Sequence, residues 1–104
     1  HLPRTFLQTP FRCINSTHVF HQYTCRLVHR DRDEFQKYLG ANGIPTMIYY
    51  PIPLHLQRAY KVAGFDEGSF PVTERLSKTV ISLPIHTEMT TQELEHICNV
   101  ISGF

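Results

Sequence analysis

The residues best suited to bind a ligand lie in one short stretch of the sequence. Tyr49 and Tyr50 provide two phenol hydroxyls, His55 provides an imidazole, and Pro51-Ile52-Pro53 stands between them. Proline fixes its backbone φ angle and has no amide hydrogen, so this segment should be a stiff loop that ends the preceding strand. Polar groups held at such a strand exit lose little entropy on binding, which favours a binding site. The structural alternative is that both tyrosines are amphipathic core residues whose hydroxyls reach water.

Two pairs of potential metal ligands have unsuitable spacing. His18 and His21 fall in a segment that we predict to be a strand, where residues three apart point to opposite faces. His96 and Cys98 fall in a predicted helix, where residues two apart diverge by about 200°. Neither pair is placed to share one ion, and we therefore predict no metal site.

The lysines of the chain also lack the surroundings of a catalytic group. Lys37, Lys61 and Lys78 occur at helix or loop positions that should face solvent. A lysine that forms a Schiff base must be unprotonated near neutral pH, which requires burial or a cationic neighbour. We therefore predict that none of these three lysines acts as an activated nucleophile.

Three strands and four helices are predicted to position the tyrosine stretch. Alternation of side-chain type predicts a strand from His18 to Val28, with one face that includes Cys25 and Leu27. The other strands are predicted over Thr46 to Tyr50 and over Val80 to Leu83, before Pro84. The helices are predicted over Arg32 to Asn42, Leu54 to Ala63, Pro71 to Thr79, and from Thr90 onward. The pattern predicts an α+β fold in which helices pack against a small sheet.

Local start and stop signals support three of these helices. Asp31 and Glu34 have the spacing of an N-terminal capping box, and so do Thr90 and Glu93. Pro71 suits the first position of a helix, where its missing amide hydrogen costs nothing. The last helix should bury an apolar stripe with the spacing i, i+3, i+4 and i+7: Leu94, Ile97, Cys98 and Ile101.

Length, charge and composition restrict the class of protein. The chain has 104 residues, of which 41% are hydrophobic, and a formal net charge of +1, which predicts one small globular domain. Basic residues are scattered among acidic ones, unlike the basic stripe of a nucleic-acid-binding protein. No apolar run approaches the roughly 20 residues that span a membrane. Three cysteines without paired spacing favour reduced thiols, and we predict a cytoplasmic protein.

The beginning of the chain differs from the rest. The sequence starts at His1 without methionine, and residues 1–17 have no clean periodicity and two prolines. We expect residues 1–17 to be an irregular lead-in from a missing domain, and residues 18–104 to be the folded domain.

An ordered set of motifs resembles the nucleotide-sugar aminotransferases of the DegT/DnrJ/StrS family, which are fold-type-I enzymes that use pyridoxal phosphate. The similar segments run in family order along most of the chain: His18-Val19-Phe20-His21-Gln22-Tyr23-Thr24 with Arg26, Gly43-Ile44-Pro45-Thr46, Tyr49 to Gln57, Phe70-Pro71 with Glu74, and Ser82-Leu83-Pro84-Ile85-His86. Several matches in order are more specific than any one of them. The resemblance implies the C-terminal small domain, with a mainly antiparallel three-stranded sheet.

The resemblance also implies an activity for the full-length protein. Such enzymes transfer an amino group, commonly from glutamate, to a keto-sugar on a nucleotide diphosphate, and the cofactor acts as the electron sink. The large domain of the family supplies the lysine and most contacts with pyridoxal phosphate. The resemblance therefore implies that this chain contains no catalytic and no cofactor-binding residue, and that the fragment alone should be inactive. The intact enzyme should be a homodimer.

Three residues are implied to face the substrate: Tyr49, Tyr50 and His55. Tyr49 matches the position where relatives place a histidine or tyrosine, and a phenol does not titrate near neutral pH as an imidazole does. His55 and Gln57 have the alternative role of fixing the loop. Departures from the family pattern at Cys25, Arg58 and Thr87 leave the sugar undecided. The rival function is a free-standing α+β module that binds a small molecule or regulates another protein, because a fold does not fix a function.

Overall fold

A three-stranded antiparallel sheet lies at the centre of the chain. The computed structural model describes residues 2–61 and 64–104. Strand β2 (Tyr23–Leu27) occupies the middle, with β1 (Leu7–Gln8) on one side and β3 (Val80–Leu83) on the other. Leu7 pairs with Leu27, and Cys25 pairs with Ile81. The predicted α+β class and antiparallel sheet are confirmed.

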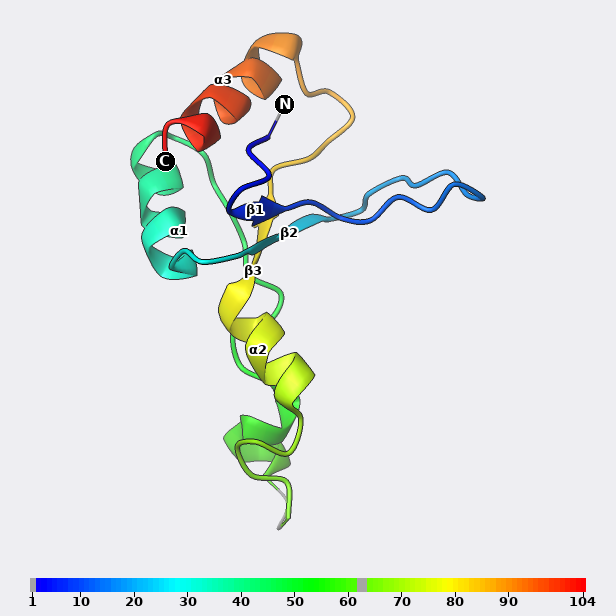
Figure 1. The fold of residues 1–104 in the computed structure, drawn as a ribbon, viewed down its shortest axis with the longest axis vertical. Helices are drawn as coiled ribbons and strands as arrows, with labels where there is room; N and C mark the ends of the chain where they lie inside the picture. The colour runs from blue at the N-terminus through cyan, green and yellow to red at the C-terminus, as the bar shows by residue number, and fades with distance from the viewer. Residues whose placement is uncertain (1, 62–63) are drawn as a thin grey trace.

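Helices α1 (Arg32–Ala41) and α3 (Thr91–Ser102) pack together on one side of the sheet (Figure 1). The core between these elements contains ten buried apolar residues: Phe6, Leu7, Cys25, Leu27, Phe35, Leu39, Ile44, Ile81, Leu83 and Ile101. The last residue, Phe104, also packs there, with its ring centroid 4.9 Å from that of Phe35. The strand face with Cys25 and Leu27 is thus the core face.

Two capping motifs fix the starts of these helices. The Asp31 side chain accepts a hydrogen bond from the Glu34 amide, which satisfies one of the free amides at the start of α1. Thr90 and Glu93 form a complete capping box at α3. Within the apolar stripe of α3, Ile101 is buried but Leu94 is 49% exposed, so the stripe covers the core only toward its C-terminal end.

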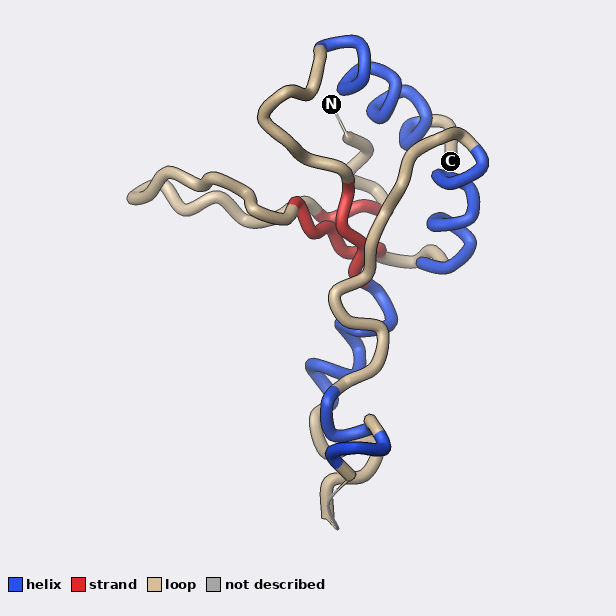
Figure 2. The backbone as a smooth tube through the Cα atoms, turned by 180° about the vertical axis from the view of Figure 1, so that it is seen from behind, coloured by secondary structure: helices blue, strands red, loops and turns tan. Residues whose placement is uncertain are grey.

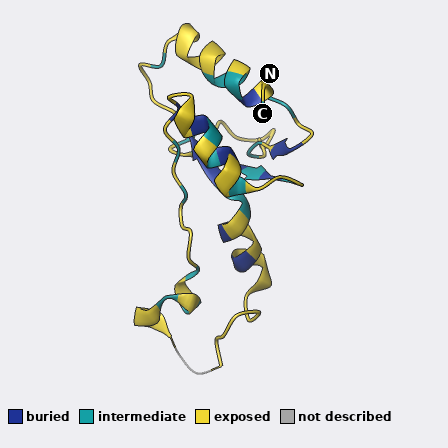
Figure 3. Cartoon of the chain, turned by 90° about the vertical axis from the view of Figure 1, so that its left-hand side faces the viewer, coloured by how far each residue is buried: buried dark blue, intermediate teal, exposed yellow. Residues whose placement is uncertain are grey.

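An arm extends away from the core. It contains helix α2 (Pro71–Thr79) and two short 3-10 turns, η1 (Leu54–Leu56) and η2 (Arg58–Tyr60) (Figure 2). Figure 3 shows that most of the arm is exposed, apart from a few positions on α2. Helix α2 runs directly into β3, so the arm is attached to the sheet through this junction. A second projection, between β1 and β2, carries three exposed apolar side chains: Phe11, Ile14 and Val19.

Three sequence predictions about the strands require correction. The strand predicted from His18 begins only at Tyr23, because residues 18–22 lie in the projection and have no neighbouring strand. Thr46 to Tyr50 forms a single bridge, Met47 with Ser82, and then turns away toward Pro51. The third strand is instead β1, inside the segment predicted to be irregular. The proposed boundary between residues 17 and 18 stays a prediction.

The helix predicted over Leu54 to Ala63 is also wrong in its described part. The chain there forms η1 and η2, and Gln57 between them has an extended conformation. The predicted end at Ala63 lies outside the described residues. Helix α2 and strand β3, by contrast, have the predicted bounds. No helix among the described residues is long and apolar enough to cross a membrane.

Candidate functional site

A groove with an aromatic wall lies where the arm meets the sheet. It has a volume of about 490 Å³. Tyr49 and Tyr50 form one wall, residues of α2 including Thr73 and Leu76 form another, and Thr24 of β2 contributes at the sheet. The remaining lining residues are Ile52, Pro53, Leu54, Gln57, Ser77 and Val80. The groove is mainly apolar, with a few hydroxyl groups, which suits a ligand that has both ring faces and polar substituents.

Both tyrosines are accessible from solvent. Tyr49 is 39% exposed and Tyr50 is 74% exposed, and their rings meet edge to face with centroids 5.8 Å apart. The peptide bond that joins them is cis. Neither residue belongs to the buried core, so the alternative that both are core residues does not hold. A second, smaller cavity lies on the other side of Tyr49, between it and residues 21–22.

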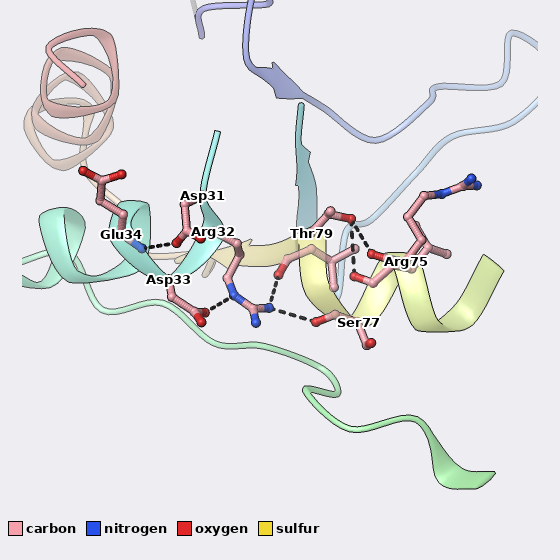
Figure 4. A network of polar contacts seen from close by, with 9 residues as sticks. Asp31, Arg32, Asp33, Glu34, Arg75, Ser77 and Thr79 are labelled. Carbon is pink, nitrogen blue, oxygen red and sulfur yellow. Dashed lines mark hydrogen bonds and ion pairs between the residues drawn. The ribbon is translucent and has the colours of Figure 1, made fainter. Parts of the chain in front are cut away.

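The position of α2, and hence of one groove wall, depends on Arg32. Its side chain is only 9% exposed. One guanidinium nitrogen donates hydrogen bonds to the carbonyl oxygens of Ser77 (3.0 Å) and Val80 (3.2 Å), where α2 ends and β3 begins (Figure 4). A cation at the C-terminus of a helix satisfies free carbonyls and interacts favourably with the helix dipole. Arg32 therefore joins the start of α1 to the base of the arm.

His55 does not line the groove. Its side chain is 9% exposed, and Nε2 lies 2.9 Å from Glu74 Oε1 on α2. An ionised carboxylate only accepts hydrogen bonds, so Nε2 is the donor. The His55 ring also packs edge to face against Phe70, at 4.8 Å. That His55 contacts a substrate stays a prediction, and the contacts of its ring here are those of a loop-fixing residue.

Glu74 connects the parts of the arm. It accepts hydrogen bonds from the Gly68 amide (2.9 Å to Oε2), the Phe70 amide (3.1 Å) and His55. These donors, above all the Gly68 amide, lower the pKa of Glu74 below its ordinary value, whereas burial acts in the opposite direction. Gly68 has a φ of +94°, a conformation that glycine adopts without strain. Glu74 therefore fixes the loop 65–70 and η1 against α2.

The described residues include no group that is suited to bond covalently with an aldehyde cofactor. Lys37, Lys61 and Lys78 are all exposed, and Lys78 pairs with Glu67 at 3.5 Å. No three histidine, cysteine, aspartate or glutamate residues of the described chain gather around a potential metal position. The groove can therefore bind and orient a ligand, but it does not present a reactive nucleophile.

Sequence reasoning identified Tyr49 and Tyr50 but missed their partners. Thr24, Thr73 and Leu76 reach the groove only because β2 and α2 meet at the sheet. The motif that contains Glu74 does not reveal its partners, although a carboxylate in the first turn of a helix is a general signal for an N-terminal interaction. Its partners, Gly68 and His55, are fixed by tertiary structure.

The chain is similar to known proteins over nearly its full length. A family model described as the DegT/DnrJ/EryC1/StrS aminotransferase family matches residues 3–102. A pleiotropic regulatory protein of Geobacillus stearothermophilus is 41% identical over 92% of this chain and 25% of its own length. The dTDP-3-amino-3,6-dideoxy-alpha-D-galactopyranose transaminase of Aneurinibacillus thermoaerophilus is 34% identical over 100% of the chain and 28% of its own length.

A solved structure has the same arrangement of elements. The crystal structure of S. venezuelae DesV in complex with a ketimine intermediate superposes with a TM-score of 0.85 at 31% identity, over 98% of this chain and 26% of that one. The chain thus spans about a quarter of the length of the relatives that it matches.

Proposed function

Because the chain belongs to the DegT/DnrJ/EryC1/StrS aminotransferase family, we propose that it is the C-terminal small domain of an enzyme that transfers an amino group to a nucleotide-linked keto-sugar. The amino donor in this proposal is glutamate, and the enzyme is a cytoplasmic homodimer. The observation that carries the proposal is the aromatic groove: two exposed tyrosines face α2 across an apolar floor. The relative named as a dTDP-sugar transaminase supports the substrate class.

In this proposal, the groove binds the sugar and excludes water from one side of it. Aromatic rings and apolar residues pack against the faces of the sugar ring, while phenol hydroxyls donate hydrogen bonds to its oxygens. The hydroxyls of Tyr49 and Tyr50 form no hydrogen bond with another described residue, so both are available to a ligand. The short loop 51–53 and the Glu74 contacts keep the groove in shape before the ligand arrives.

The chemistry of amino transfer would be supplied by pyridoxal phosphate, which acts as an electron sink when bound. This proposal places its site outside the described residues, and the exposure of all three lysines supports this placement. We infer that the cofactor is held mainly by a large domain outside this chain and that this chain alone is inactive. An exposed lysine without a catalytic neighbour would react with the aldehyde only weakly and without selectivity.

Direct assay of the full-length protein tests the proposal. The purified protein would be incubated with glutamate and dTDP-linked or UDP-linked keto-sugars, and the amino-sugar and 2-oxoglutarate would be measured by mass spectrometry. We expect equal amounts of both products with at least one sugar. The 104-residue chain, assayed alongside, should form neither product and should show no stoichiometric labelling by pyridoxal phosphate and borohydride.

The name of the regulatory relative favours a second candidate, a regulatory module that binds a nucleotide sugar without converting it. This candidate would be favoured over the enzyme if the protein bound the same sugars but formed no amino-sugar and no 2-oxoglutarate with any amino donor tested.

A further inference from the structure

A cavity lined by basic residues lies beside the aromatic groove. It has a volume of about 810 Å³ and is formed by the first residues of the chain and the end of β2. Three arginines line it, Arg4, Arg12 and Arg26, together with His29. None of the described residues that line the cavity is an aspartate or glutamate. Its walls are therefore strongly positive, and they attract anions.

Arg26 has the most constrained position of the three. It lies on the central strand, where its backbone pairs with Gln8 on one side and Val80 on the other. Its Nε atom is buried and has no hydrogen-bond partner among the described residues. A buried guanidinium N–H without an acceptor is unfavourable, so this atom requires an acceptor that the described chain does not supply.

Arg12 is held close to this cavity by an aromatic ring. Its guanidinium carbon lies 5.1 Å from the ring centroid of Phe20, at the distance of a cation–π contact. The contact leaves the N–H groups of Arg12 free to donate in the plane of the guanidinium. Neither Arg12 nor Arg26 forms an ion pair with a carboxylate of the described chain.

The basic cavity and the aromatic groove are connected along β2. Arg26 and Thr24 are two residues apart and therefore lie on the same face of the strand, opposite to Cys25. A small intermediate cavity is lined by both of them, together with Leu76 and Val80. Thr24, Leu76 and Val80 also line the aromatic groove, so the intermediate cavity adjoins this groove and extends to Arg26.

We propose that Arg26, assisted by Arg12 and Arg4, binds a phosphate oxyanion, and that this group is the diphosphate of the nucleotide sugar. The inference rests on the proposed function for the identity of the ligand. A guanidinium presents parallel N–H groups that match two phosphate oxygens, whereas apolar residues and tyrosines match a sugar. The order of the lining residues then sets the direction of the ligand: sugar at Tyr49 and Tyr50, diphosphate at Arg26.

Calorimetry on the full-length protein, loaded with its cofactor, tests this inference with two probes: inorganic pyrophosphate and thymidine 5′-diphosphate. The variants are Arg26→Gln, Arg26→Lys and Arg12→Gln. Arg58→Gln is the control, because Arg58 is exposed in η2 and lines neither cavity. We expect Arg26→Gln to raise the Kd of both probes at least about tenfold, Arg12→Gln and Arg26→Lys to raise it less, and the control to leave it unchanged.

Steady-state kinetics should agree with the binding data. Arg26→Gln should raise KM for the nucleotide sugar by about the same factor as the Kd, with kcat within about twofold of wild type, because the diphosphate is remote from the reacting carbon. If Arg26→Gln binds both probes within twofold of wild type, the inference is overturned. The inference is also overturned if Arg26→Gln lowers the melting temperature without weakening probe binding, because Arg26 would then pair with a carboxylate outside the described chain.

The calorimetric and catalytic results separate the two proposals. Loss of probe binding in Arg26→Gln, in a protein that forms no amino-sugar, would support the oxyanion site and contradict the aminotransferase function. Amino-sugar formation by the wild-type protein, with probe binding unchanged in Arg26→Gln, would support the aminotransferase function and contradict the oxyanion site. Absence of probe binding by the wild-type protein would also overturn the oxyanion site.

Discussion

Replacement of Arg32 by methionine tests how the arm is attached to the core. Methionine preserves most of the aliphatic length of arginine but removes both hydrogen bonds to the carbonyls of Ser77 and Val80. A hydrogen bond from a charged donor contributes about 1.5 to 3 kcal/mol, and an unsatisfied buried acceptor costs about 1 to 3 kcal/mol. Because both bonds come from one guanidinium nitrogen, their contributions do not add in full, and we expect a total loss of about 2 to 4 kcal/mol of unfolding free energy.

The assay is urea unfolding of the 104-residue chain, followed by circular dichroism. Arg75→Met is the matched control, because Arg75 lies on α2 with an exposed side chain. Arg32→Lys keeps the charge but lacks the planar guanidinium that reaches both acceptors. Its loss of unfolding free energy should therefore lie between zero and that of Arg32→Met. A loss below about 0.5 kcal/mol for Arg32→Met, or an equal loss for Arg75→Met, would refute the reasoning. In the full-length protein, Arg32→Met should also raise KM for the proposed nucleotide-sugar substrate, because α2 forms one wall of the groove.

Further expected outcomes concern single sites in the same chain. Phe35→Ala should lower the unfolding free energy by about 3 to 5 kcal/mol in urea, since Phe35 is fully buried; a loss under 1 kcal/mol would contradict the assigned core. Thr90→Ala should cost about 0.5 to 2 kcal/mol through loss of the capping box, and no change would show that the box is not formed. The fold lowers the pKa of Glu74 from 4.5, so its ionised form should stabilise the chain above about pH 4.5, and this contribution should disappear as pH falls through the lower folded value. Glu74→Gln should remove that part of the pH dependence of the unfolding free energy, and an unchanged pH dependence would contradict the assignment. Burial raises the pKa of Cys25 to about 12, so mass spectrometry after iodoacetamide treatment at pH 8 should find Cys13 labelled and Cys25 unlabelled until the chain unfolds.

Local chemistry was sufficient to predict the elements whose signals lie within a few residues. Pro71 at the first helical position and Thr90 with Glu93 act over one helical turn, and the corresponding helices begin where expected. Val80 to Leu83 is a continuous apolar-rich run stopped by Pro84, and it is β3. In each case the residues that specify the element are neighbours in the sequence.

The errors arise where an element depends on distant residues. Leu7 and Gln8 form a strand only because β2 offers its free edge, and nothing in residues 1–17 alone indicates this pairing. The β-prone residues 46–50 meet β3 only at Met47 and then leave the sheet to form the arm. His55 and Glu74 are separated by 19 residues, so their contact follows from the packing of the arm and not from local spacing. Tertiary context overrides propensity at these positions.

The proposed role of the aromatic groove is tested most directly by removing the hydroxyl groups of its two tyrosines. We would measure kcat/KM for the nucleotide sugar in full-length Tyr49→Phe and Tyr50→Phe variants. Tyr60→Phe is the control, because Tyr60 is also exposed in the arm but does not line the groove. One lost hydrogen bond costs about 0.5 to 1.5 kcal/mol with a neutral partner and about 1.5 to 3 with a charged one, which predicts roughly a two- to hundredfold decrease. Melting temperatures should not change, because no described protein group depends on these hydroxyls. If both variants retain wild-type kcat/KM, the tyrosines serve only as scaffold and the groove is not the sugar site.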